Sequence, residues 1–105
     1  MKTIHDITEF DRFIASDQPV VVKFFADWCP DCKRLDIYLP SVLEELPNIP
    51  FQQINKDELS ELAERHQVMG IPSLLVFKNG EKIGHLHSAN AKTPEEVQEF
   101  LATFF

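Results

Sequence analysis

The chain has 105 residues, enough for a single domain over residues 1–105 and too few for two domains of ordinary size. Hydrophobic residues make up 44% of the sequence and charged residues 26%, which is typical of a globular domain and excludes a disordered chain. The 17 acidic and 10 basic residues give a formal net charge of -7, which disfavours nucleic acids and anionic membrane surfaces as partners.

The apolar segments of the chain are short. Leu74–Phe77 is typical of them, whereas a membrane-spanning helix needs roughly 20 apolar residues. The first residues include Lys2, His5 and Asp6 where a signal peptide would place its apolar stretch. We therefore expect a cytoplasmic protein with no membrane partner.

The first third of the chain predicts a helix followed by a buried strand. Asp6 is placed to cap a helix over residues 6–16, in which apolar residues recur at helical spacing. Residues 20–25 are β-branched and aromatic with one polar exception, Lys23, as in a strand covered on both faces. A short extra strand is expected near residues 3–5.

The middle of the chain predicts two more helices and a strand. Apolar residues recur three and four apart over residues 30–46, although Pro40 lies inside this pattern and is expected to kink or break the helix. Residues 51–55 are typical of a short strand. Asp57 is placed to cap a third helix, whose apolar side is formed by Leu59, Leu62 and Ala63.

The last third of the chain predicts a hairpin and a terminal helix. Residues 73–78 and 81–87 have strand character, and Asn79-Gly80 between them favours a tight turn, so these two strands are antiparallel. A capping pattern at Thr93 starts the last helix. This order of elements indicates an α/β fold in which helices cover a mixed sheet.

The segment Trp28–Lys33, with the order Trp-Cys-Pro-Asp-Cys-Lys, lies where the central strand gives way to the second helix. A thiolate on Cys29 would face unpaired backbone N–H groups and the positive end of the helix dipole, both of which stabilise negative charge. Cys32 lies one turn further on and on the same face, close enough to form a disulfide with Cys29 and more shielded from solvent. Pro30 removes a backbone donor that the helix leaves unused and fixes the turn between the sulfurs. This arrangement predicts an attacking thiol and a resolving thiol.

Two other interpretations of the cysteines are a metal site and a pair of inert buried thiols. A structural zinc site needs four ligands, and the sequence has no second cysteine pair. Redox exchange is therefore favoured, and no metal is expected.

His85 and His87 alternate on a predicted strand and are expected to face solvent. His66 lies near the end of the third helix, where its side chain can interact favourably with the negative end of the helix dipole.

Three segments resemble the thioredoxin family: Phe24–Lys33, Gly70–Ser73 and Phe77–Gly80. The resemblance extends over nearly the whole chain. The Cys-Pro-Asp-Cys variant is similar to small thioredoxin-related proteins of that type more than to the common Cys-Gly-Pro-Cys members. The resemblance implies a thioredoxin fold, in which a central mixed five-stranded sheet is flanked by four helices.

The resemblance also implies how the site is built. Cys29 would be the nucleophile and Cys32 the resolving residue, facing a cis bond between Ile71 and Pro72. The backbone of Ile71 would pair with an extended segment of the substrate, and Trp28 with Ile71 would border a flat contact surface. The family binds no cofactor beyond its redox-active disulfide, here Cys29–Cys32. Its partners are disulfide-containing proteins and a flavoprotein thioredoxin reductase supplied with NADPH.

Three positions depart from the family pattern. Lys23 replaces a buried aspartate that is proposed to take the proton of the resolving thiol, Gln53 replaces a lysine near that aspartate, and Ser88 replaces a glycine of the last contact loop. The Lys23 cation would favour the thiolate, and a neutral Lys23 could serve as the missing base. In the alternative interpretation its aliphatic stem is packed and its ammonium pairs with a carboxylate such as Asp36.

Asp31 acts in the opposite direction, because a carboxylate beside Cys29 disfavours a second negative charge. We nevertheless expect a monomeric thiol-disulfide oxidoreductase that reduces protein disulfides. One alternative is a glutaredoxin-like reductase that a low-molecular-weight thiol restores. Pro30 favours it, whereas Asp31, Trp28 and the segment Ile71-Pro72-Ser73 oppose it. The other is a non-enzymatic interaction module that uses the fold as a docking surface.

Overall fold

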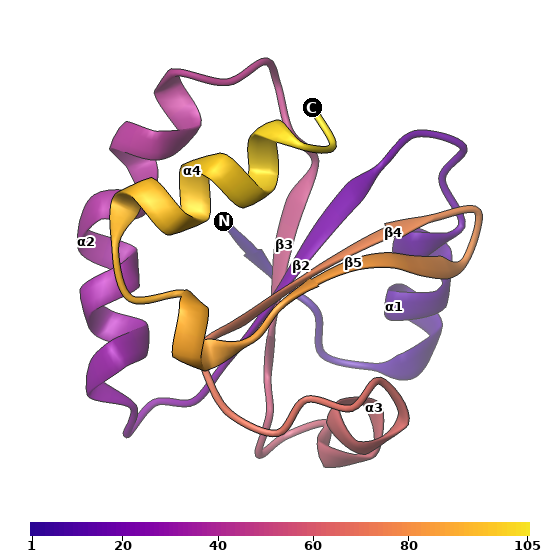
Figure 1. Ribbon diagram of the computed structural model, residues 1–105. Helices are drawn as coiled ribbons and strands as arrows, with labels where there is room; N and C mark the ends of the chain where they lie inside the picture. The colour runs from indigo at the N-terminus through magenta and orange to yellow at the C-terminus, as the bar shows by residue number, and fades with distance from the viewer.

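The computed structural model describes residues 1–105, and its elements alternate between strands and helices (Figure 1). The strands are β1 (Lys2–Thr3), β2 (Val20–Phe25), β3 (Phe51–Asn55), β4 (Ser73–Lys78) and β5 (Glu81–Leu86). The helices are α1 (Ile7–Ile14), α2 (Pro30–Glu44), α3 (Ser60–Arg65) and α4 (Pro94–Ala102), and a 3-10 turn, η1 (Ser88–Asn90), precedes α4.

The five strands form one mixed sheet in the order β1-β3-β2-β4-β5. β3 pairs in parallel with both β1 and β2, whereas β4 is antiparallel to β2 and to β5. In Figure 1, α2 and α4 lie on one side of this sheet, and α1 and α3 lie on the other. The expected α/β fold with a five-stranded sheet and four helices is confirmed.

β2 has apolar residues in succession because it is covered on both faces. Val20, Val22 and Phe24 belong to the core cluster that also contains residues of α1 and α3. Val21 belongs to the cluster that contains residues of α2 and α4. Lys23 is also buried, at 1% exposure, and alternation along the strand places it on the same face as Val21. The strand therefore sends a charged group into the layer between the sheet and α2.

Pro40 does not break the second helix, which runs from Pro30 to Glu44. Of the kink or break expected at Pro40, the break does not occur, because Pro40 itself is exposed while Leu39 and Val42 beside it are buried in the core. The packing of these neighbours outweighs the one backbone hydrogen bond that proline removes. None of the helices combines the length and the apolar character needed to cross a membrane.

The hairpin turn and the cap of the last helix are as the sequence predicted, whereas the cap of the third helix is not. Asn79 and Gly80 have φ of 54° and 80°, as a tight turn between β4 and β5 requires. Thr93 and Glu96 form a capping box at the start of α4. α3 begins at Ser60 with Leu59 at the N-cap position and without a side-chain cap, while Asp57, two residues before Leu59, accepts the indole N–H of Trp28.

Candidate active site

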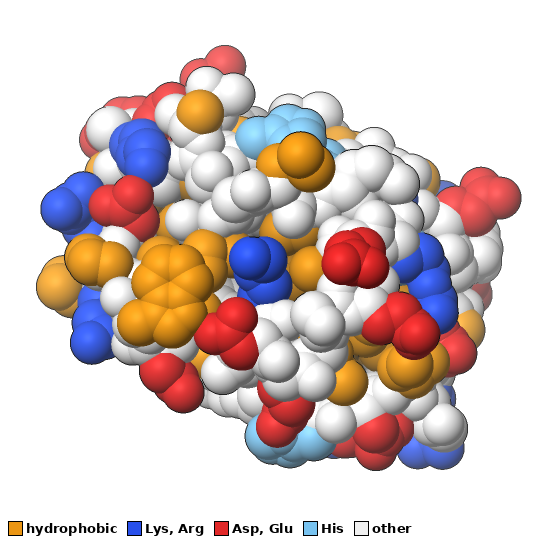
Figure 2. Space-filling model, turned by 90° about the horizontal axis from the view of Figure 1, so that it is seen from below, with side chains coloured by type: hydrophobic (Ala, Val, Ile, Leu, Met, Phe, Trp, Pro, Cys, Tyr) orange, Lys and Arg blue, Asp and Glu red, His pale blue; other side chains and the backbone are white.

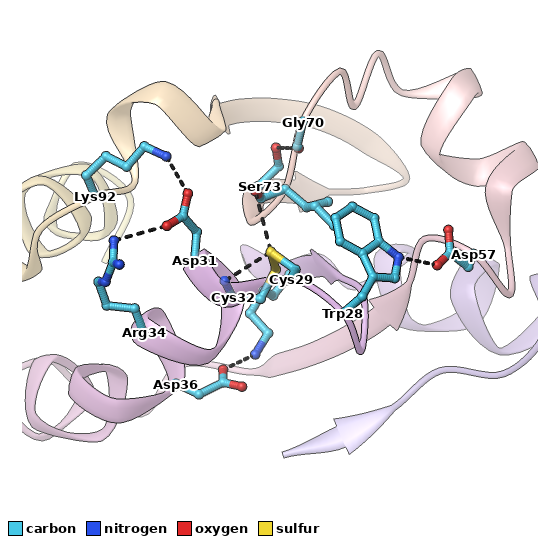
Figure 3. Close-up of a disulfide and its surroundings, with 12 residues drawn as sticks. Trp28, Cys29, Asp31, Cys32, Arg34, Asp36, Asp57, Gly70, Ser73 and Lys92 are labelled. Atoms are coloured by element: carbon cyan, nitrogen blue, oxygen red, sulfur yellow. Dashed lines mark hydrogen bonds and ion pairs between the residues drawn. A yellow bond between two sulfur atoms is a disulfide. The ribbon is translucent and has the colours of Figure 1, made fainter.

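Both cysteines lie at the N-terminus of α2, directly after β2 and a short loop. Cys29 is the N-cap residue, with an extended backbone (φ -88°, ψ 108°), and its Sγ accepts a hydrogen bond from the backbone N–H of Cys32 at 3.1 Å. The two side chains are joined by a disulfide, and their Cα atoms are 5.3 Å apart (Figure 3). The sulfur of Cys29 therefore occupies the position that a capping oxygen takes in other helices.

Both sulfur-bearing residues are covered in this oxidised state. Cys29 is 3% exposed and Cys32 is 2% exposed, so both residues are buried and their exposures hardly differ. Ala26 is buried with them, and the partly buried Phe25 and Ile71 pack against the group. The disulfide thus has an apolar rim.

The loop before β4 lies against the cysteines, as the resemblance implied. The Ile71-Pro72 bond is cis, and the carbonyl oxygen of Ile71 lies 3.8 Å from Cys29 Sγ. The hydroxyl of Ser73 donates to the carbonyl of Gly70 at 2.6 Å and ties the loop together. Ser88 approaches Gly70 so closely that a Cβ there would lie 2.4 Å from its Oγ. Because Gly70 has no side chain, the hydroxyl of Ser88 fits against it.

Trp28 is an exposed aromatic residue beside the disulfide. Its side chain is 64% exposed, and its indole Nε1–H donates to Asp57 Oδ2 at 2.8 Å. Figure 2 views the molecule from the side on which α2 begins, and hydrophobic side chains gather there among acidic and basic ones. Sequence reasoning assigned Asp57 to a helix cap and missed this contact, for which no local pattern gives a signal.

Asp31 lies on the other side of the disulfide from Trp28 and faces two cations (Figure 3). Lys92 Nζ donates to its Oδ2 at 2.7 Å, and Arg34 Nη1 donates to its Oδ1 at 3.0 Å. The Lys92 ammonium, followed by Arg34, holds the pKa of the Asp31 carboxyl below its usual value of 3.8. Asp31 therefore stays ionised beside Cys29, and its charge is compensated.

Lys23 forms an ion pair with Asp36 of α2. The lysine side chain is 2% exposed and the aspartate 54% exposed, so the pair joins the buried layer to the surface. Both residues line a cleft of about 470 Å³ with Met1, Leu39 and Gln53. Gln53 itself donates to Thr3 Oγ1 at 3.0 Å rather than to Lys23.

Among the histidines, His85 departs from the expectation, whereas His87 is exposed and His66 lies at the end of α3 as expected. His85 and His87 stack with ring centroids 3.8 Å apart, yet only His87 is exposed. Burial, assisted by His87 and Lys82, lowers the pKa of His85 to about 4. His66 packs against the rings of Phe10 and Phe77, and burial lowers its pKa as well. The prediction of a solvent-facing His85 was wrong, because the residue is only partly exposed and its Nε2 is buried.

The thioredoxin family model matches residues 2–103 of this chain. The chain belongs to the thioredoxin family. Thioredoxin-1 of Saccharomyces cerevisiae is 36% identical over 95 residues, which cover 90% of this chain and 89% of the yeast protein. A thioredoxin of Chlamydia pneumoniae is 43% identical over 77 residues, 73% of this chain and 74% of that protein.

Solved thioredoxin structures have the same fold. The oxidised thioredoxin of Plasmodium falciparum is 30% identical, covers 97% of this chain and 98% of its own, and superimposes with a TM-score of 0.78. A Malassezia sympodialis thioredoxin reaches a TM-score of 0.86 at 25% identity, with 99% of this chain and 90% of that chain covered.

Membership of the thioredoxin family establishes the class of reaction. The chain is a thiol-disulfide oxidoreductase that acts on disulfide-containing proteins. Thioredoxins carry no bound cofactor, because the redox-active disulfide is part of the protein. Here that disulfide is the pair Cys29–Cys32 at the start of α2.

Proposed function

We propose that this thioredoxin reduces protein disulfides with Cys29 as the nucleophile and Cys32 as the resolving thiol. The thiolate of Cys29 attacks one sulfur of the substrate disulfide, which forms a mixed disulfide and releases the other substrate sulfur as a thiolate that takes up a proton. Cys32 then attacks the sulfur of Cys29, releases the second substrate thiol and closes the Cys29–Cys32 disulfide. The two cysteines lose two electrons to the substrate, and of the two protons that the substrate thiols take up, one comes from the Cys32 thiol and one from solvent.

The observation that carries this assignment is the capping position of Cys29. Its sulfur accepts the backbone N–H of Cys32 at 3.1 Å. A thiolate there gains from that hydrogen bond and from the positive end of the helix dipole. Cys32 lies inside the first turn with its sulfur toward Cys29, which suits the second step.

The surface around the disulfide supports docking of an extended substrate segment. Trp28 is exposed and hydrogen-bonded to Asp57, so its ring is presented in a fixed orientation. Ile71 and Pro72 lie across from it, with the Ile71 carbonyl 3.8 Å from Cys29 Sγ. We assign substrate binding to Trp28, Ile71 and Pro72, with backbone pairing at Ile71.

Three residues tune the reactivity of Cys29 in this proposal. The Lys23 cation, on β2, favours the Cys29 thiolate, and Pro30 fixes the first turn of α2. Asp31 disfavours the thiolate through its negative charge. The neutral form of Lys23 as a base for Cys32 is the competing role, and the variants described in the Discussion separate the two.

The oxidised protein needs an external reductant to act again. We propose a flavoprotein thioredoxin reductase supplied with NADPH, in the cytoplasm, with the protein acting as a monomer. An assay that couples insulin reduction to NADPH oxidation, run with either thioredoxin reductase or glutathione and its reductase, tests this source of electrons. Turnover with glutathione and its reductase, but not with thioredoxin reductase, would contradict the proposed source of electrons. Absence of the protein from the cytoplasmic fraction of its cells would contradict the proposed location.

The two cysteines predict different phenotypes. Cys29→Ser is expected to abolish the reduction of insulin disulfides, because it removes the attacking sulfur. Cys32→Ser is expected to accumulate mixed disulfides, because no thiol releases the substrate from Cys29. Non-reducing gel electrophoresis after incubation with insulin detects the trapped species. Full activity of Cys29→Ser, or trapping in the double variant, would refute the assignment.

A further inference from the structure

Asp31 is a carboxylate placed at the second residue of the helix that bears the reactive thiol. Its two oxygens face different cations, with Lys92 Nζ at 2.7 Å from Oδ2 and Arg34 Nη1 at 3.0 Å from Oδ1. Arg34 lies on the same helix, one turn on, whereas Lys92 comes from the segment before α4 and is 61 positions away in sequence. Figure 3 shows the carboxylate directed toward these cations and away from the disulfide.

The backbone around Lys92 is fixed by its neighbours. Ala91 is 3% exposed, and its carbonyl lies 3.4 Å from the hydroxyl of Tyr38 on α2. The backbone N–H groups of Lys92 and Thr93 both donate to Glu96 Oε1, at 3.2 Å and 3.1 Å. Lys92 is therefore held between a buried residue and a capping box, and its side chain reaches Asp31 from an anchored position.

The charges around Asp31 decide whether this residue opposes the Cys29 thiolate. One carboxylate with two cations gives the group Asp31, Arg34 and Lys92 a net charge of +1 (-1 + 2), and loss of Lys92 would leave it neutral. The side chains of Asp31 and Lys92 are 35% and 44% exposed, so water screens the pair only in part. The pKa of Asp31 is lowered chiefly by Lys92, in agreement with this pairing.

We propose that Lys92 is a positioning residue that supports the reactivity of Cys29 by holding the Asp31 carboxylate away from the sulfur and compensating its charge. The proposal rests on the proposed role of Cys29 as the nucleophile. It explains how a helix that begins with an acidic residue beside its reactive thiol keeps a stabilised thiolate. It also makes the reactivity of the site depend on how the segment before α4 docks against α2.

The other charged groups around the start of α2 must stay unchanged in a test. Lys33 and Asp36 lie on the helix itself, and Lys23 reaches Asp36 from β2. Asp57 lies on the far side of Trp28. None of these forms an ion pair with Asp31 or Lys92, so substitution of Lys92 leaves their contacts in place.

The test compares Lys92→Gln with the wild type and with Lys78→Gln. Lys78 is an exposed lysine at the end of β4 remote from Pro72, so it controls for the change in net charge. The rate at which iodoacetamide alkylates Cys29 is measured against pH, and peptide mass spectrometry identifies the alkylated residue. At pH values below the pKa of Cys29 we expect Lys92→Gln to react about two- to fivefold more slowly, the size of a partly exposed ion pair, and Lys78→Gln to match the wild type.

The Asp31→Asn background tests whether Lys92 acts through Asp31. With no carboxylate to hold, Lys92 is a free surface lysine, and we expect Lys92→Gln to change the alkylation rate little in this background. In glutathione redox buffers, Lys92→Gln alone is expected to have a smaller reduced fraction than the wild type, because a less stable thiolate makes the disulfide harder to reduce.

An equal slowing in both backgrounds would overturn the proposal, because Lys92 would then act on the sulfur directly. No slowing of Lys92→Gln, or an equal slowing of Lys78→Gln, would overturn it as well. Alkylation at Cys32 in the wild type would instead refute the nucleophile assignment, so the two failures are distinguishable.

Discussion

Lys23 is the residue whose chemistry fits its position least. A buried ammonium loses its hydration, and the loss is tolerable only when a partner and hydrogen bonds replace water. Asp36 supplies the partner from α2, and the Lys23 ammonium also lies 5.6 Å from the centre of the Phe25 ring. The pairing that sequence reasoning held open for Lys23 is thus present, beside a cleft through which water can reach the pair.

Substitution of either partner of this pair gives distinguishable results. Asp36→Asn is expected to lower the free energy of unfolding by about 2 kcal/mol, because it leaves a buried ammonium with a weaker acceptor. Lys23→Met in the Asp36→Asn background is expected to recover part of this loss, because the buried charge is gone. Urea unfolding monitored by circular dichroism measures both. A double variant less stable than Asp36→Asn would contradict the explanation.

Lys23→Met alone also tests the two redox roles. If the cation favours the thiolate, as we propose, alkylation of Cys29 slows at pH values below its pKa while release of substrate by Cys32 keeps its rate. An unchanged alkylation rate with slower release would favour the role of Lys23 as a base.

At the scale of elements, the site depends on how two helices begin. Cys29 caps the start of α2 with its sulfur. The N-terminus of this helix in turn stabilises negative charge on the same sulfur. α4 starts with the Thr93–Glu96 capping box, whose glutamate also accepts the N–H of Lys92. The cap of one helix therefore orients a residue that contacts the first turn of the other.

Thr93→Ala should weaken α4 at its start. The substitution removes the side-chain acceptor for the Glu96 N–H, at 3.2 Å, and is expected to lower the free energy of unfolding by about 1 kcal/mol. The midpoint of urea unfolding measures this loss. Thr8→Ala is the matched control, because Thr8 is an exposed residue within α1 and alanine is favourable there. Equal effects of the two substitutions would mean that the capping box contributes nothing.

At the scale of the whole molecule, the sheet separates two cores and brings the parts of the site to one edge. β2 ends at Phe25 shortly before Cys29, and β4 begins at Ser73 directly after Pro72. Because β2 and β4 are antiparallel neighbours, with Phe24 opposite Ser73, the end of one and the start of the other lie side by side. This placement sets the Ile71 carbonyl against the cysteines.

The burial of His85 makes stability depend on pH. Its pKa in the folded protein is lowered from 6.5 to about 4, mainly by burial, so the folded state keeps this ring neutral while the unfolded chain takes up a proton. The stability that the neutral ring contributes is complete above pH 6.5 and is lost as the pH falls toward 4. We expect the urea midpoint to fall less steeply over this interval in His85→Gln than in the wild type.

The exposed His5 provides the control for this effect. His5→Gln removes a surface histidine whose ring contacts only Glu58 at the surface, and it is expected to change the pH dependence less than His85→Gln does. Parallel curves for His85→Gln and the wild type would show that His85 does not carry the effect.

The sequence by itself determined most features whose parts lie within about one turn or one hairpin, although the expected Asp57 cap and a break at Pro40 did not occur. The spacing of Cys29 and Cys32, the Asn79-Gly80 turn and the Thr93–Glu96 box depend on contacts between residues a few positions apart, which the chain order specifies directly. The same local patterns predicted the order of helices and strands, while the resemblance supplied the sheet of five strands and the cis bond.

Only the tertiary structure decided the contacts between distant segments. Trp28 meets Asp57 across 29 positions, Cys29 lies near Ile71 across 42, and Lys92 meets Asp31 across 61. Local patterns cannot rank such contacts, because a carboxylate such as Asp57 suits a helix cap and an indole N–H equally well until packing brings one of them near. Burial likewise depends on what the fold places over a residue, which is why His85 was expected at the surface and is half-buried.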